Sequence, residues 1–145
     1  MRKTFLLPLL LIFLSGCGPS LQELMITSPT TKVVEKSNAF CVYNKLHMLT
    51  LSDEPGYHWS SGWDPSIEKG ELIRTMNNGS TNLSAFNIHR MGNNTVIELR
   101  TASQYGIQPS GYFSKNKHLA EQILSSADFS GCPDYQELQI SPTSP

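Results

Sequence analysis

The clearest pattern of apolar and polar positions lies between residues 83 and 100. Residues 95–100 alternate strictly, with Ile97 and Leu99 on one face, and residues 83–91 alternate less regularly. Between them, Gly92-Asn93-Asn94 offers residue types that tolerate the positive φ of a tight turn. The pattern predicts a β-hairpin.

Two further apolar segments are typical of strands. Residues 39–43 (Ala-Phe-Cys-Val-Tyr) are rich in β-branched and aromatic residues, and residues 46–51 could continue them after a break at Asn44-Lys45. Residues 71–76 form another apolar run that ends at the turn signal Asn-Asn-Gly. We expect both to join the hairpin in one sheet.

One helix is predicted near the C-terminal end. Ser114 can cap a helix that starts at residue 115 or 116, and Gly131 and Pro133 would end it. The apolar residues between them follow helical spacing: Leu119, Ala120, Ile123, Leu124 and Ala127. Strands followed by a single helix predict an α+β domain with a small antiparallel sheet and one C-terminal helix.

The N-terminal region has the layout of an export signal. Arg2 and Lys3 precede an almost unbroken apolar run over residues 5–14. Such a run is too short for the roughly 20 residues that span a bilayer as a helix, but it matches the apolar centre of a signal peptide. Residues 1–16 are therefore predicted to be a signal peptide.

Leu14-Ser15-Gly16-Cys17 resembles the lipobox of bacterial lipoproteins. The resemblance implies that Cys17 is acylated, with palmitate among the chains, after cleavage before it. Two or three acyl chains hold a protein durably in a membrane. Gly18 in place of aspartate implies the outer membrane, with the domain facing the periplasm. An ordinary cleaved signal peptide and an uncleaved anchor are the alternatives.

The rest of the chain is predicted to form one domain behind a tether. Residues 17–36 carry prolines and polar residues, which favours a lipidated tether; residues 37–140 form the periplasmic domain, and 141–145 a loose tail. Removing residues 1–16 from the 145 leaves 129. With Arg2 and Lys3 gone from 11 basic residues and all 12 acidic residues retained, the net charge falls from −1 to −3. This balance, without runs of one sign, argues against a nucleic-acid partner.

The cysteine count predicts a disulfide. If Cys17 is lipidated, Cys41 and Cys132 remain as one pair in an oxidising compartment. We expect them to be bonded, which would close the domain over a loop of about 90 residues and add about 4 to 5 kcal/mol in the chain-entropy model. Two free buried thiols, or one reactive cysteine, are the alternatives.

No motif for catalysis, metal or cofactor binding is recognisable. The four histidines are not in H-x-x-x-H or H-E-x-x-H spacing, and no G-x-S-x-G elbow occurs. Asp53, Glu54 and His58 form the best local cluster and could bind a metal or move a proton. Such a group is more often a solvated turn, so we expect neither an enzyme nor a resident cofactor.

An aromatic segment is the candidate binding surface. Tyr57, Trp59 and Trp63 lie between the turn signals Pro55-Gly56 and Asp64-Pro65, and we predict a surface loop that binds a partner. The alternative is that one or both tryptophans belong to the core.

The plan of anchor, tether and small disulfide-closed domain resembles that of the immunity lipoproteins that neutralise type VI secretion effectors. The resemblance implies a periplasmic inhibitor or immunity factor that binds a toxin or another envelope protein. No residue motif supports it, so no functional residues are carried over. The alternatives are a pilotin-like assembly factor for an outer-membrane complex, and an envelope enzyme or metal-binding protein that uses the Asp53 cluster.

Overall fold

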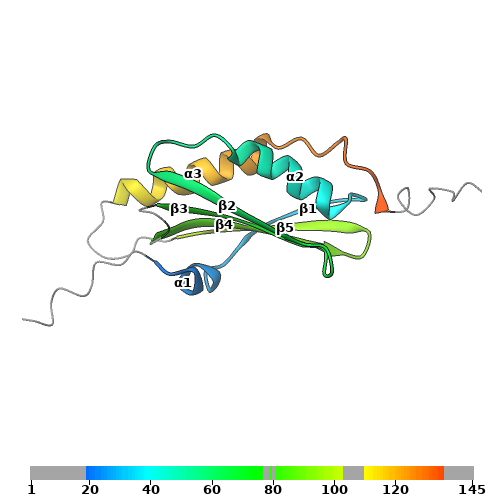
Figure 1. Ribbon diagram of the computed structural model, residues 1–145, viewed down its shortest axis with the longest axis horizontal. Coiled ribbons are helices and arrows are strands. Elements are labelled where there is room, and N and C mark those ends of the chain that lie inside the picture. The colour runs from blue at the N-terminus through cyan, green and yellow to red at the C-terminus, as the bar shows by residue number, and fades with distance from the viewer. Residues whose placement is uncertain (1–18, 77–78, 80, 103–109, 136–145) are drawn as a thin grey trace, which may run out of the picture.

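The protein folds as one antiparallel sheet with helices on both faces. The computed structural model describes residues 19–76, 79, 81–102 and 110–135. Its elements are α1 (Leu21–Met25), β1 (Thr30–Val34), α2 (Ala39–Thr50), β2 (Tyr57–Asp64), β3 (Lys69–Met76), β4 (Thr81–Met91), β5 (Asn94–Thr101) and α3 (Ser110–Ser126). The strands lie in the order β1-β5-β4-β3-β2. Figure 1 shows α2 and α3 on one face and α1 on the other. The predicted α+β class is confirmed.

The three central strands are those that the sequence predicted best. The runs 71–76, 83–91 and 95–100 lie in β3, β4 and β5, and the 92–94 turn joins the last two with Gly92 at a φ of +64°. Because opposed residues of antiparallel strands share a face, Phe86 and Ile88 of β4 lie beside Leu99 and Ile97 of β5.

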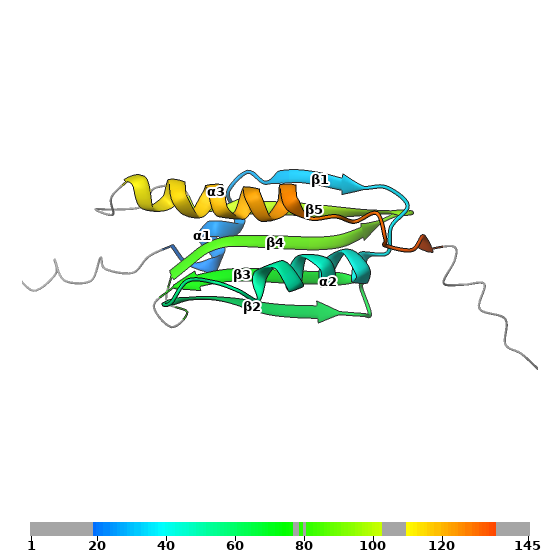
Figure 2. The same cartoon turned by 90° about the horizontal axis from the view of Figure 1, so that it is seen from above.

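Two apolar clusters stabilise the fold. Seen from above, α2 lies over β3 and α3 over β4 and β5 (Figure 2). The larger cluster fills the space between these helices and the sheet: Val42, Tyr43, Leu46, Leu72, Phe86, Ile88, Ile97, Leu99, Ala120, Leu124, Ala127 and Phe129. The smaller one includes Leu24 of α1 and Leu83 and Ala85 of β4.

The prediction of a strand over residues 39–43 is wrong, because this segment is the start of α2. The Asn38 side chain accepts a hydrogen bond from the Cys41 amide at 3.1 Å and caps the helix. The buried positions recur at helical spacing: Ala39, Val42, Tyr43, Leu46 and Thr50. Asn44, which the prediction treated as a break, lies on the exposed face.

The prediction of a tether over residues 17–36 is also wrong from residue 19 onward. Ser20 and Glu23 form a capping box that starts α1, and Leu24 is fully buried. β1 then pairs with β5 along its whole length. The signal segment, Cys17 and the 141–145 tail lie outside the described residues.

The C-terminal helix is confirmed, but it begins at Ser110 and not after a cap at Ser114. Phe113 is buried in the smaller cluster, which holds the first turn of α3 on the sheet. The Cys41–Cys132 disulfide is confirmed, with the two Cα atoms 5.6 Å apart. It joins the segment after α3 to the first turn of α2, whereas the sequence had placed Cys41 in a strand.

Candidate functional site

The predicted aromatic loop is a strand. All eight residues of β2 pair in regular register with β3, with Trp59 opposite Arg74 and Trp63 opposite Gly70. The turn signals on both sides were recognised correctly, but they delimit an edge strand. Since alternate side chains share a face, Tyr57, Trp59 and Trp63 all lie on the face that α2 and α3 cover.

Both tryptophan rings contact the core and keep an exposed margin. Trp59 stacks on Phe86 with ring centroids 5.6 Å apart. Trp63 lies 5.1 Å from the Phe40 ring and 5.3 Å from the Tyr43 ring. Both are half-buried and pack against the larger cluster. The two rings therefore contribute to packing, and their role in binding stays a prediction.

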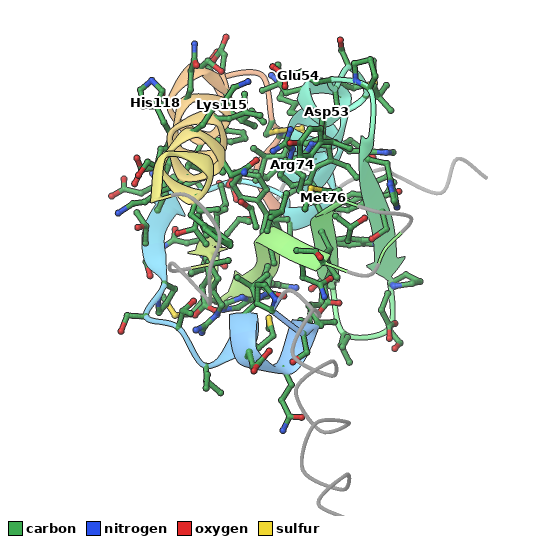
Figure 3. The ribbon with its side chains drawn as sticks, turned by 90° about the vertical axis from the view of Figure 1, so that its left-hand side faces the viewer. Asp53, Glu54, Arg74, Met76, Lys115 and His118 are labelled. Atoms are coloured by element: carbon green, nitrogen blue, oxygen red, sulfur yellow. A yellow bond between two sulfur atoms is a disulfide. The ribbon has the colours of Figure 1, made fainter. Side chains whose placement is uncertain are left out.

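Two adjoining cavities lie beside α3 at the end of the molecule where α2 finishes. Their volumes are about 150 and 300 Å³, and both are lined by Glu54 and Leu119. We call them together the interhelical groove, lined by Leu49, Ser52, Asp53, Glu54, Tyr57, Trp59, Arg74, Lys115, Asn116, His118, Leu119, Gln122 and Ile123. Figure 3 shows Glu54 and Lys115 above Arg74 at this end.

A buried ion pair forms part of the groove. Arg74 donates from Nε to Asp53 Oδ2 at 2.7 Å and from Nη2 to Asp53 Oδ1 at 2.6 Å. Only 2% of the Arg74 side chain and 7% of the Asp53 side chain are exposed. Nη1 of Arg74 also donates to the Asn116 side chain of α3, and the guanidinium lies 4.3 Å above the Tyr57 ring. The pair thus connects β3, α3 and the segment after α2.

The electrostatics of the pair favour the ionised carboxylate. Burial of Asp53 works against its charge, but the hydrogen bonds from Arg74 and the Glu54 amide, the positive charge of Arg74 and a hydrogen bond from Trp59 outweigh it. The pKa of Asp53 is therefore lowered from its ordinary value of 3.8. At neutral pH, both charges are present and compensated.

A second ion pair closes the rim of the groove. Lys115 Nζ lies 3.0 Å from Glu54 Oε1, and the two side chains are 71% and 57% exposed. Exposed pairs of this kind contribute about 0 to 1 kcal/mol. A ligand can therefore displace this contact at little cost.

The structure does not bring Asp53, Glu54 and His58 together. Asp53 and Glu54 pair with the two cations of the groove, whereas His58 alternates with Tyr57 and Trp59 and lies on the opposite face of β2. His58 Nε2 is 2.8 Å from Thr75 Oγ1. Across the part of the chain that the structure describes, no three His, Cys, Asp or Glu side chains are grouped to hold a metal.

Arg74 is the residue of this site that the sequence analysis missed. It occupies the same face of β3 as the fully buried Leu72. An arginine at an apolar position of a central strand is a usable signal, because a buried cation requires a partner. Its partner, Asp53, lies in the segment after α2, and the sequence pattern predicts a strand instead of this helix.

Trp63 lies away from the groove, at the other end of β2. A hollow of about 370 Å³ is lined there by Gly62, Trp63, Asp64, Ile67, Lys69 and Glu71. Phe40 is 47% exposed and Ile67 is 63% exposed. The three aromatic residues of the prediction therefore do not form one surface.

Comparison with known proteins gives no relative: no family model, no curated protein and no solved structure matches the chain. Among the described residues, the helices are all too short or too polar to cross a membrane.

Proposed function

We propose that the protein is a lipid-anchored lipoprotein of the bacterial envelope that binds another protein through the interhelical groove, as an inhibitor or immunity factor. The lipobox-like sequence at Cys17 supports the anchor. The open groove, with aromatic residues in it and an easily displaced ion pair at its rim, is the observation that carries the binding role.

The start of the domain favours close attachment to the bilayer. Pro19 is buried, and its carbonyl accepts hydrogen bonds from the Asn82 amide at 3.1 Å and from Asn82 Nδ2 at 3.3 Å. Only Gly18 separates Pro19 from Cys17. Acyl chains on Cys17 would therefore hold the domain directly at the membrane surface. Leu21 and Ile26, 39% and 81% exposed, lie at this side.

The groove faces the other way. α1 lies on one face of the sheet, and α2 and α3 lie on the opposite face (Figure 1). With α1 toward the bilayer, the groove would open to the periplasm. A soluble partner could then reach it.

The groove has the character of a protein-binding surface. Leu49 and Leu119 supply apolar walls beside the half-buried Trp59, and Glu54 and Lys115 supply a polar rim. Apolar centres with polar rims are typical of protein interfaces. The two cavities are at or below the low end of the roughly 300–1,000 Å³ of small-molecule sites, and they suit single side chains of a partner's loop.

The surroundings of the groove favour tight binding. The bidentate Arg74–Asp53 pair fixes one wall, and the disulfide fixes the far end of α2. A rigid site loses less conformational entropy when it binds. An inhibitor requires this property, because it must hold its target for a long time.

Replacing Cys17 tests the anchor. Cys17→Ser should produce a chain that is uncleaved or released into the periplasm, with the mass of the acyl chains lost. Membrane fractionation and intact mass give the result. If the Cys17→Ser protein stayed in the membrane fraction and its intact mass differed from that of wild type only by the exchange of Cys for Ser, lipidation at this residue would be ruled out.

Site-specific cross-linking tests the groove. A photo-crosslinking amino acid in place of His118, which lines the groove, should capture a protein in the full-length, membrane-bound chain. The same amino acid in place of the exposed Ser125 of α3 is the control. Leu49→Arg should abolish the adduct at position 118. Equal adducts at both positions, or an adduct that Leu49→Arg leaves unchanged, would contradict binding in the groove.

The captured protein also distinguishes the two binding roles. A soluble toxin supports inhibition. A ring-forming subunit of the outer membrane would instead favour an assembly factor.

A further inference from the structure

The two edges of the sheet differ in how well they are protected from pairing with another strand. β1 has five residues, follows Pro29 and contains Lys32, whose Nζ turns inward to the Leu124 carbonyl at 3.1 Å. Short length, proline and inward-pointing lysine are devices that block edge pairing. β2 has eight residues in unbroken register with β3 and contains no proline, lysine or arginine. β2 is therefore the less protected of the two edges.

We propose that two copies of this chain associate through their β2 strands, antiparallel about a two-fold axis at Ser61. Such an axis stands perpendicular to the sheet and keeps the helices of both copies on one face. Opposed residues must then share a face, which limits the register. About Ser61, Trp59 lies opposite Trp63 of the second copy, and His58 lies opposite its Asp64.

The opposed side chains in this register are complementary. An aromatic pair across strands stabilises a sheet by about 0.2 to 1 kcal/mol, and an opposite-charge or hydrogen-bonded pair contributes similarly. The symmetry doubles both contacts. Centring the axis on Ser60 would instead place Trp59 against Ser61 and His58 against Gly62. Of these two registers, the one about Ser61 gives the complementary pairs.

The carboxylate of Asp64 can accept a hydrogen bond from His58 of the second copy. It is exposed, and hydrogen bonds from the Ser66 hydroxyl and amide lower its pKa below the ordinary value of 3.8. Nε2 of His58 already contacts Thr75, so Nδ1 is the nitrogen that would meet Asp64. The hollow of about 370 Å³ beside Gly62 and Asp64 leaves room for the incoming imidazole.

The middle of β2 allows a close approach. Ser60, Ser61 and Gly62 are small and exposed, so no bulky side chain stands at the axis. On the helix side, Phe40 is 47% exposed and its ring contacts Trp63. The second copy would cover part of this apolar surface.

The two-fold symmetry is also compatible with anchoring through Cys17. This compatibility, unlike the pairing itself, rests on the proposed function. A two-fold axis perpendicular to the sheet places α1 of both copies on the same face. Both anchors could then enter one bilayer, while both grooves remain on the opposite face. An axis lying in the plane of the sheet would direct the two anchors to opposite sides.

Cysteine cross-linking in the full-length, membrane-bound chain tests the register. At Ser61, the two opposed Cα atoms would lie about 4.5 to 5.5 Å apart, within the range of about 4.4 to 6.8 Å for disulfides. At Ser60, they would lie roughly 8 Å apart from the strand spacing and rise. Ser61→Cys should give a disulfide-linked dimer on mild oxidation, and Ser60→Cys should give several-fold less. Wild type, with the same other cysteines, controls for cross-links through those.

A Ser61→Cys chain that stays monomeric, or a Ser60→Cys chain that cross-links equally well, would overturn the proposal. Ser61→Lys supplies a second measurement, because two facing lysines should repel and Ser61 is exposed, so the fold should persist. Light scattering of the detergent-solubilised chain should give a dimer for wild type and for Ser125→Lys, and a monomer for Ser61→Lys. Equal masses for wild type and Ser61→Lys would contradict pairing through β2. Both measurements can be repeated on the Cys17→Ser chain, and neither involves the groove, so failure here is distinct from failure of the proposed function.

Discussion

Arg74, on an inner strand of the sheet, holds the carboxylate of Asp53 with two hydrogen bonds of 2.7 and 2.6 Å. The two residues are 21 positions apart and belong to different layers of the fold. Their pairing fixes the segment after α2 against the sheet, and this segment also supplies Glu54 to the rim of the groove. The shape of the candidate site therefore depends on a buried ion pair.

Breaking that pair should destabilise the protein strongly. Asp53→Asn removes the negative charge and leaves the Arg74 guanidinium buried, which costs about 3 to 5 kcal/mol in comparable cases. Denaturant titration gives the free energy of unfolding. Lys115→Met, which removes only the exposed ion pair, is the control and should change it by less than about 1 kcal/mol. If the two variants changed the free energy of unfolding by similar amounts, the stability of the fold would not depend on the pairing of Arg74 with Asp53.

The same pair should make stability depend on pH at the acid end. The pKa of Asp53 is lower in the folded protein than its ordinary value of 3.8. The contribution of Asp53 is therefore complete above the pKa of the unfolded chain and is lost as the pH falls through the pKa of the folded state. Unfolding free energies measured between pH 6 and pH 2 should show this loss in wild type and a smaller one in Asp53→Asn. Parallel curves would contradict it.

Gly70 should not tolerate a side chain. A Cβ at this position of β3 would overlap the Tyr43 ring and lie 3.0 Å from the Trp63 ring. Gly70→Ala should therefore cost about 1 to 3 kcal/mol through overpacking. Gly62→Ala is the matched control on β2, because no atom lies within 4 Å of a Cβ there. Thermal melts of the two variants give the comparison, and an unchanged melting temperature for Gly70→Ala would refute the tight packing.

Local sequence patterns predicted the elements whose partners are near in the chain. β4 and β5 are joined by a tight turn, so their alternation and the Gly92 signal sufficed. β1 pairs with β5, about 65 residues later, and nothing within its own five residues indicates that partner. Residues 39–43 suit a strand by composition, and only the Asn38 cap and the spacing of Leu46 and Thr50 indicate the helix.

The candidate site was predicted only in part. Tyr57 and Trp59 were chosen because aromatic residues near turns often bind partners, and both lie in the groove. Their strand conformation follows from pairing with β3, which the turn signals do not reveal. Arg74 and Asn116 meet only in the folded chain, since Asn116 comes from α3 and Arg74 from β3.

The disulfide should contribute a large share of the stability. It links residues 91 positions apart, and closing such a loop in the unfolded chain corresponds to about 4 to 5 kcal/mol in the chain-entropy model. The double variant Cys41→Ser/Cys132→Ser should lose about this amount, measured by urea unfolding under identical conditions. Wild type treated with reductant should fall to the same value, and a loss below about 1 kcal/mol in both would contradict the estimate.

Substituting the two tryptophans one at a time should distinguish a role in packing from a role in binding. Both rings pack on the core, so Trp59→Ala and Trp63→Ala should each cost about 3 kcal/mol, the low end for a buried aromatic residue, because both are half-buried. Only Trp59 lines the groove, so only Trp59→Ala should also weaken the adduct formed at position 118. Trp63→Ala is then the matched control for lost stability. The adduct should be compared at a temperature where both variants remain folded, as judged by circular dichroism. If Trp63→Ala reduces the adduct as much as Trp59→Ala does, the loss follows from stability, and Trp59 does not contact the partner.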